Sequence, residues 1–213
     1  MSISLFSGCG GPQVQTSGGD ILRVGWCSEP DTLNPLTSYS TESKQITNLV
    51  YEPLIGYGTD LEYVYKLAKS FEYSADGKTV TYHLQENVKW QDGEPFTSAD
   101  VAFTYKLIKD TGLSEAAQFL EDLESVETPD DLTAVFNFSS PQAFNCAPVI
   151  LILPEHIWGG MSAGEIEAYA NDNPVGTGAY QFKEWVQGAS VSIERNEDYY
   201  GKLPAASGII YVL

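Results

Sequence analysis

Residues 71–101 read FEYSADGKTVTYHLQENVKWQDGEPFTSADV, and this stretch decides the fold class. Val80, Tyr82 and Leu84 alternate with polar neighbours, which is typical of a strand with one buried face. The preceding pair, Asp76-Gly77, is a strong hairpin signal because glycine readily adopts the positive φ of a tight turn. The sequence therefore predicts an antiparallel hairpin around this turn.

The second half of the stretch predicts a turn and then a helix. Asp92-Gly93 has the composition of a tight turn. Thr97 and Asp100 have the spacing of a capping box, in which each side chain bonds the other residue's backbone N–H at a helix start. Val101, Tyr105 and Ile108 share one face of the helix that follows, so we expect that face to be buried.

Outward from this stretch the chain alternates between strands, turns and short helices. A helix is expected at about 42–51, capped by Ser40 or Thr41, and a helical region from His156. Strands are expected at residues 21–26, 132–138, 149–153, 179–185, 190–195 and 208–213. The predicted fold class is α+β, rich in antiparallel hairpins.

Composition and charge narrow the function classes. The 213 residues include 29 acidic and 11 basic side chains, a net charge of −18, which repels phosphate and excludes nucleic acid as a partner. The apolar fraction of 43% is too high for a disordered acidic chain. His83 and His156 are too far apart in sequence for a histidine-rich metal cluster, so we expect no metal and no cofactor.

The first residues do not resemble folded structure. A short apolar run ends at Cys9, and a flexible glycine-rich leader reaches residue 18. This pattern resembles the end of a bacterial lipoprotein signal, in which the cysteine is lipidated; the alternative is a disordered tail with an incidental cysteine. Cys27 and Cys146 either form a disulfide or remain two buried free thiols.

Seven sequence blocks, in order, resemble the extracytoplasmic solute-binding proteins of the peptide/nickel ABC-transporter family. The resemblance runs from about Ile21 to Leu213. Its blocks are Pro30–Pro35 (PDTLNP), Tyr51–Leu54 (YEPL), Leu67–Ser70 with Asp76–Thr79, Leu84–Trp90, Asp92–Val101, Gly176–Tyr180 (GTGAY) and Arg195–Gly201 (RNEDYYG). Gln85, Phe71, Ala179 and Tyr200 depart from the family's usual residues, and we interpret them as packing substitutions.

The resemblance implies one lobe of a two-lobed clamshell with an inserted subdomain. Residues 1–18 would be the lipobox remnant and leader, 19–50 and 160–213 the two parts of the first lobe, and 51–159 the inserted α+β subdomain. A second lobe would follow Leu213, where the strand stops mid-run.

The best candidate for ligand binding is the loop before the helix at 42–51. Ser38, Tyr39, Ser40 and Thr41 lead into a helix N-terminus whose unpaired N–H groups would face a ligand. In the resembling family this segment lies along the cleft. The alternative is ordinary capping by Ser40 or Thr41 beside a surface tyrosine.

A second candidate follows from the resemblance. An aromatic side chain from the inserted subdomain reaches the ligand in related proteins, and Phe119 would fill that role, unless it is a core residue of a short helix. Gly176-Thr177-Gly178 is not followed by a phosphate-binding pattern, so we interpret it as a tight crossing between lobes. No catalytic residues are predicted.

The predicted function is a non-enzymatic receptor that captures peptides, or similar small polar solutes, outside the cytoplasmic membrane for an ABC permease. It would be a monomer in the periplasm or on the outer face of the membrane, held there only by a lipid anchor. The alternatives are a nickel-chelate or oligosaccharide binder of the same family, a secreted hydrolase domain, and a β-rich adhesive module. The hydrolase lacks support because no nucleophile motif or zinc-protease motif occurs.

Overall fold

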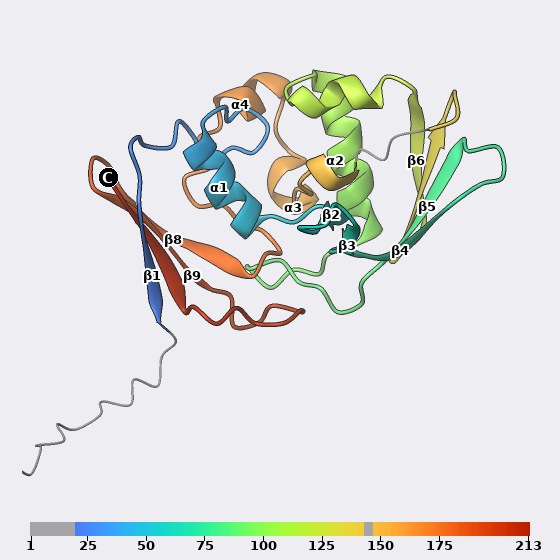
Figure 1. Cartoon of the computed structure of the whole chain (residues 1–213). Helices are drawn as coiled ribbons and strands as arrows, with labels where there is room; N and C mark the ends of the chain where they lie inside the picture. Colours follow the sequence, from blue (N-terminus) through green and yellow to red (C-terminus); the bar gives the residue numbers. More distant parts are fainter. Residues whose placement is uncertain (1–19, 143–146) are drawn as a thin grey trace, which may run out of the picture.

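A computed structural model of the chain describes residues 20–142 and 147–213 and has the predicted α+β class (Figure 1). Two sheets lie at opposite ends of the molecule with helices between them. The elements in chain order are β1 (Ile21–Gly25), α1 (Thr41–Val50), β2 (Ile55–Tyr57), β3 (Tyr63–Tyr65), β4 (Ala68–Tyr73), β5 (Thr79–Leu84), α2 (Ser98–Thr111), η1 (Glu115–Leu120), β6 (Leu123–Asp130), β7 (Thr133–Phe138), η2 (Ala147–Val149), α3 (Glu155–Trp158), α4 (Ala163–Ala168), β8 (Tyr180–Val186), β9 (Ser190–Arg195) and β10 (Gly208–Val212).

The first sheet has the order β1-β10-β9-β8 and joins the two ends of the described chain. β8, β9 and β10 are antiparallel neighbours, whereas β1 runs parallel to β10, with Ile21 opposite Gly208. The sheet is therefore mixed. The predicted antiparallel hairpins are present in it, and the parallel pair of β1 and β10 was not predicted. A parallel pair needs a long crossover, and nearly the whole chain provides it here.

The second sheet has the order β4-β5-β7-β6 and contains the hairpins that the sequence predicts. Gly77 has a φ of 70° at the turn between β4 and β5, and Phe71 lies opposite Tyr82. Alternate residues of β5 and β7 are buried, as the period of two requires.

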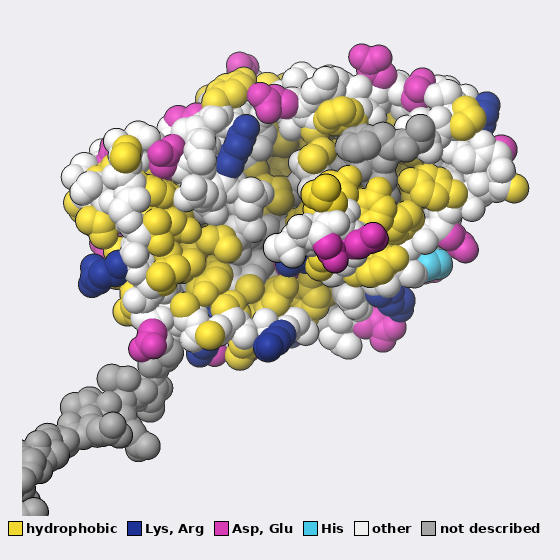
Figure 2. Space-filling view, in the orientation of Figure 1, with side chains coloured by type: hydrophobic (Ala, Val, Ile, Leu, Met, Phe, Trp, Pro, Cys, Tyr) yellow, Lys and Arg dark blue, Asp and Glu magenta, His cyan; other side chains and the backbone are white. Residues whose placement is uncertain are grey.

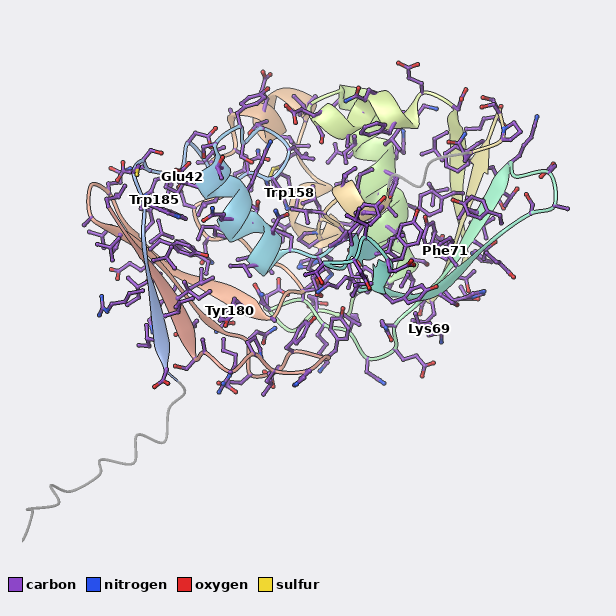
Figure 3. The ribbon with its side chains drawn as sticks, in the orientation of Figure 1. Glu42, Lys69, Phe71, Trp158, Tyr180 and Trp185 are labelled. Atoms are coloured by element: carbon purple, nitrogen blue, oxygen red, sulfur yellow. The ribbon has the colours of Figure 1, made fainter. Side chains whose placement is uncertain are left out.

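Helix α2 packs its predicted face against this second sheet. Both hydrogen bonds of the capping box at Thr97 and Asp100 are present, and Val101, Tyr105 and Ile108 are buried. The ring of Tyr105 meets that of Phe136 on β7 edge to face, with centroids 4.6 Å apart. Trp158 of α3, labelled in Figure 3, is buried, and its ring meets that of Tyr169 edge to face with centroids 5.1 Å apart.

Gly176 and Gly178 let the chain pass close to the C-terminal end of α1. The Gly178 N–H donates to the carbonyl of Val50 over 2.8 Å, and a Cβ on either glycine would collide with backbone carbonyl oxygens of Leu49 or Val50. Gln91 Oε1 accepts from the Gly176 N–H over 3.0 Å and fixes the crossing from the other side. These contacts explain why two glycines are required here.

One predicted strand is wrong. Residues 149–153 form the end of η2 and a single bridge between Leu151 and Pro53, not a strand. The run is apolar because Ile150, Ile152 and Leu153 are buried. An apolar run of five residues indicates burial but not backbone conformation.

Two sequence expectations concern cysteines. Cys27 is an exposed free thiol, which contradicts the expectation that it is buried. Cys9, Cys146 and the proposed leader at 1–18 lie outside the described residues. Within residues 20–142 and 147–213, no helix is long and apolar enough to cross a membrane. The lobe boundaries remain a prediction.

Candidate functional site

A cavity of about 740 Å³ lies where α1, η1, β2 and η2 meet. Its volume is within the range of small-molecule sites. Segments far apart in the sequence contribute its walls. The lining residues used below are Leu36, Ser38, Tyr39, Lys44, Thr47, Asn48, Tyr57, Glu115, Phe119 and Val149.

The loop that forms one wall is held in place by Asn34. This buried side chain donates to the carbonyls of Ile166 over 2.8 Å and Tyr169 over 2.9 Å, and its Oδ1 accepts from the Leu36 N–H over 2.9 Å. An asparagine that bonds the backbone two residues ahead closes a local turn. The turn presents Leu36, Ser38 and Tyr39 to the cavity on a fixed backbone.

At the N-terminus of α1 the structure shows the capping by Ser40 that was the alternative to ligand binding, and whether the remaining N–H groups face a ligand stays a prediction. The Ser40 hydroxyl caps the helix by accepting from the Ser43 N–H. Asp31 Oδ1 accepts from the Ser40 hydroxyl over 2.9 Å and from the Ser43 hydroxyl over 2.6 Å. Asp31 Oδ2 accepts from the Tyr39 N–H over 2.9 Å. The Asp31 carboxylate therefore holds the loop before α1 to the side chains of the first turn of the helix.

These contacts determine the charge of Asp31. Partial burial by itself raises the pKa of this carboxyl, but the bonds from Ser43, Tyr39, Ser40 and Thr32 outweigh it and hold the pKa far below its usual value. Asp31 is consequently ionised throughout the neutral range, next to the positive end of the helix.

The structure separates the five predicted ligand-binding residues into two groups. Ser38, Tyr39 and Phe119 line the cavity, although Phe119 is eighty residues further along the chain. Tyr39 is 72% exposed and Phe119 41% exposed, so neither is a core residue. Ser40 and Thr41 are not among the lining residues, and Ser40 is engaged in capping. Ligand contact by the first group remains a prediction.

Sequence reasoning missed the polar face of α1. Lys44, Thr47 and Asn48 follow one another at helical spacing and line the cavity together. Lys44 Nζ lies 3.6 Å from Glu115 Oε2 on η1, so an ion pair spans the cavity between two segments. The sequence signal for this face is the i, i+3, i+4 spacing of the polar residues Lys44, Thr47 and Asn48.

Among the described lining residues, Lys44 and Glu115 are the only charged side chains, and no histidine or cysteine occurs. The two histidines lie elsewhere: His83 Nε2 is 3.9 Å from a Glu72 carboxylate oxygen, and His156 Nε2 is within hydrogen-bonding distance of Asp92 Oδ2, at 2.7 Å. No cluster of metal-binding side chains occurs in the described part of the chain. The cavity offers aromatic faces, amides and hydroxyls, groups that bind and orient small ligands.

A buried carboxylate lies directly before Pro53, another lining residue. Glu52 accepts a hydrogen bond from the Tyr199 hydroxyl over 2.7 Å and lies 3.6 Å from Lys66 Nζ. Burial raises the pKa of Glu52, and the bond from Tyr199 and the charge of Lys66 offset only part of the effect. The group joins the end of α1 to the segment after β9 and has a structural role.

A second cavity, of about 760 Å³, lies between α2 and the edge strand β6. It is formed mainly by neighbouring elements and contains none of the predicted residues. The first cavity is the better candidate because it combines residues from distant parts of the sequence.

Comparison with known families gives one match over most of the chain. Residues 62–213 match the family described as bacterial extracellular solute-binding proteins, family 5 Middle. Protein XP55 of Streptomyces lividans is 33% identical over 193 residues, covering 89% of this chain and 34% of that protein. The oligopeptide-binding protein AppA of Bacillus subtilis is 32% identical over 201 residues, covering 91% of this chain and 37% of AppA.

Solved structures show the same fold. The structure of AppA in complex with a nonapeptide matches with a TM-score of 0.82 and 30% identity, over 92% of this chain and 40% of AppA. NikZ of Campylobacter jejuni in complex with Ni(L-His) matches with a TM-score of 0.81 and 28% identity, over 91% of this chain and 39% of NikZ. The chain thus spans little more than a third of the length of these proteins.

Proposed function

This chain belongs to family 5 of the bacterial extracellular solute-binding proteins, and on that premise we propose that it forms part of a receptor that captures peptides outside the cytoplasmic membrane. The receptor would deliver them to an ABC permease and would catalyse no reaction. The observation that carries the proposal is the cavity that brings Tyr39 and Phe119 together from separate segments.

The chemistry of the cavity suits a peptide. Tyr39, Tyr57 and Phe119 provide apolar area for side chains, while the exposed amide of Asn48 supplies hydrogen-bonding groups for a peptide backbone. The only two charges in the described lining are 3.6 Å apart and neutralise one another. The AppA structure, similar over 92% of this chain, holds a nonapeptide.

The proposed mechanism is capture between two lobes. The cavity would form one wall of a cleft, and a second lobe from sequence beyond these 213 residues would close over the solute. Closure excludes water, and the permease would recognise the closed form. Lipidation at Cys9 would keep the receptor at the outer face of the membrane as a monomer.

The test is a titration of the ¹⁵N-labelled chain followed by its amide chemical shifts, since one lobe alone is expected to bind weakly. The probes are penta-alanine, a nickel–histidine chelate and a short oligosaccharide. Peptide binding should shift the resonances of residues 36–39, 44–48 and 115–119. A matched pair of variants is Tyr39→Ala, which alters the cavity, and Leu203→Ala, an exposed residue outside the lining.

The outcomes separate the candidates. Shifts with penta-alanine that weaken in Tyr39→Ala but not in Leu203→Ala support peptide capture. Shifts at the same residues with the nickel chelate alone favour the second candidate, suggested by the similarity to NikZ. No response to any of the three probes contradicts a transport receptor, and an esterase and peptidase screen then tests the hydrolase alternative.

A further inference from the structure

Five aromatic side chains form a surface cluster beside the cavity, which we call the aromatic shelf. Its members come from β2, β3 and β4 and are Tyr57, Tyr63, Tyr65, Phe71 and Tyr73. Figure 3 shows Phe71 in a dense group of side chains near β3 and β4. Sequence reasoning did not predict the hairpin of β2 and β3, and so did not find this cluster.

The rings of the shelf are in mutual contact. Tyr57 and Tyr63 lie opposite each other on β2 and β3 and stack, with ring centroids 5.4 Å apart. Phe71 lies at the centre, with its centroid 5.6 Å from that of Tyr63, 6.3 Å from Tyr65 and 5.8 Å from Tyr73. Such contacts fix the ring orientations and leave little freedom to be lost on binding.

The shelf is nevertheless exposed. Its four tyrosines each remain between 40% and 47% accessible to solvent, and Val64 on the same hairpin is 41% accessible. Figure 2 shows hydrophobic side chains gathered over this part of the molecule and extending toward the hollow between its two halves. Contiguous exposed apolar surface of this kind marks an interaction site in soluble proteins.

The shelf is continuous with the cavity. Tyr57 lines the cavity and also stacks on Tyr63, so a ligand that fills the cavity and leaves it past Tyr57 meets the shelf next. Beyond the cavity, Tyr63 and Tyr65, which are 40% and 47% exposed, provide area for a further planar or large apolar group.

We propose that the aromatic shelf is a second subsite, which binds an aromatic side chain of a peptide where the peptide extends beyond the cavity. This inference rests on the proposed function. Aromatic pairs prefer offset or edge-to-face contacts, and the exposed tyrosine rings can offer both to an incoming ring. The hydroxyls of the tyrosines keep the surface wettable when no ligand is bound.

The experiment compares affinities within one peptide series. Penta-alanine and the five pentapeptides in which phenylalanine replaces one alanine are titrated into the ¹⁵N-labelled chain. The measured quantity is the ratio of Kd for penta-alanine to Kd for the best phenylalanine peptide. For the wild-type chain we expect a ratio of roughly 2 to 10, the range for one aromatic contact.

Four variants make the ratio specific. The pair Tyr63→Ser with Tyr65→Ser removes shelf rings and should bring the ratio to about one. The conservative pair Tyr63→Phe with Tyr65→Phe keeps the rings and should keep the wild-type ratio. Leu203→Ser, an exposed apolar residue outside the shelf and the cavity lining, is the matched surface control. Tyr65→Ser alone replaces the double variant if circular dichroism shows that the latter is unfolded.

A ratio that falls only in the variants that replace shelf tyrosines by serine, and not in Leu203→Ser, supports the shelf. A wild-type ratio of one overturns the shelf, and so does a ratio that is unchanged when shelf tyrosines are replaced by serine. In either case the proposed function still stands if penta-alanine binds. If neither penta-alanine nor any phenylalanine peptide binds the wild-type chain, the proposed function fails, and the shelf fails with it.

Discussion

The hydroxyl of Ser43 donates a 2.6 Å hydrogen bond to Oδ1 of Asp31, twelve residues earlier in the chain. The same oxygen accepts from Ser40, the N-cap of α1, so Asp31 joins the loop of the cavity wall to the start of the helix. The contact explains how Tyr39 is positioned, because its N–H is bonded to the other oxygen of the same carboxylate.

Asp31→Ala should lower the free energy of unfolding by about 1 kcal/mol at neutral pH, the usual value of a helix cap. The folded pKa of Asp31 is lowered, so its contribution is present above the unfolded pKa of about 3.9 and is lost as pH falls through the folded value. Urea unfolding at about pH 6 and about pH 3 should therefore show a smaller difference from wild type at the acidic value.

The control is Asp172→Ala, at an exposed acidic residue. An Asp31→Ala difference that stays constant between the two pH values contradicts the assigned role of the carboxylate. Salt should weaken the effect moderately, because Asp31 is largely exposed.

Glu52→Gln should have the opposite pH dependence. Burial raises the folded pKa of Glu52, so the carboxyl is most favourable while protonated and stability is lost as pH rises from the unfolded pKa of about 4.3 through the folded value. The glutamine can still accept from Tyr199 and carries no charge. Thermal unfolding from about pH 4 to 7 should show the variant gaining stability relative to wild type as pH rises.

The matched control for this series is Glu86→Gln, whose exposed side chain pairs with Lys69 at 3.0 Å. We expect it to follow wild type within about 0.5 kcal/mol. A Glu52→Gln variant that loses stability relative to wild type as pH rises would falsify the account, because the ion pair of Glu52 with Lys66 would then outweigh the cost of burying the carboxylate.

Gly176→Ala should destabilise the fold by about 2 kcal/mol or more, since the new Cβ collides with the backbone of Val50 and neither segment can move freely. Gly164→Ala, in α4, meets no atom within 4 Å and should leave stability unchanged or slightly higher. Denaturant unfolding of the two variants measures the difference. Equal stability of the two variants contradicts the close crossing.

Elements with local signals could be predicted from sequence. The hairpin at Gly77 and the capping box at Thr97 each depend on a few adjacent residues, and the structure confirms them. Family resemblance added the prediction that Tyr39 and Phe119 face one ligand, which local patterns cannot give; the structure shows that both line one cavity, and contact with a ligand stays a prediction.

Features that depend on distant contacts could not be predicted. The parallel pairing of β1 with β10 joins residues almost 190 positions apart. The bonds from the Ser40 and Ser43 hydroxyls to Asp31 link the helix to a residue outside it, and the helix sequence alone does not indicate that partner. The hairpin of β2 and β3 is local but was missed for another reason: its strands have three residues each, too few to show a reliable alternation of apolar and polar residues.

Tyr39 and Ser40, adjacent in the loop, should differ in what their loss affects. Tyr39→Ala removes an exposed ring from the cavity and should weaken peptide binding several-fold, roughly the value of one aromatic contact, without lowering the melting temperature. Ser40→Ala removes the cap of α1 and should lower stability by about 1 kcal/mol. Chemical-shift titration and thermal unfolding of both variants separate the two roles, and a reversal of the pattern contradicts the division of the loop.

The most direct test of the central claim is photo-crosslinking with a pentapeptide that carries one benzophenone side chain, followed by mass spectrometry of the adducts. The account predicts adducts on residues of the cavity, within 35–57, 114–119 and 148–151, or of the aromatic shelf, within 63–73, and their suppression by excess penta-alanine. Adducts concentrated instead at the groove between α2 and β6, around Phe103 and Val126, would contradict it.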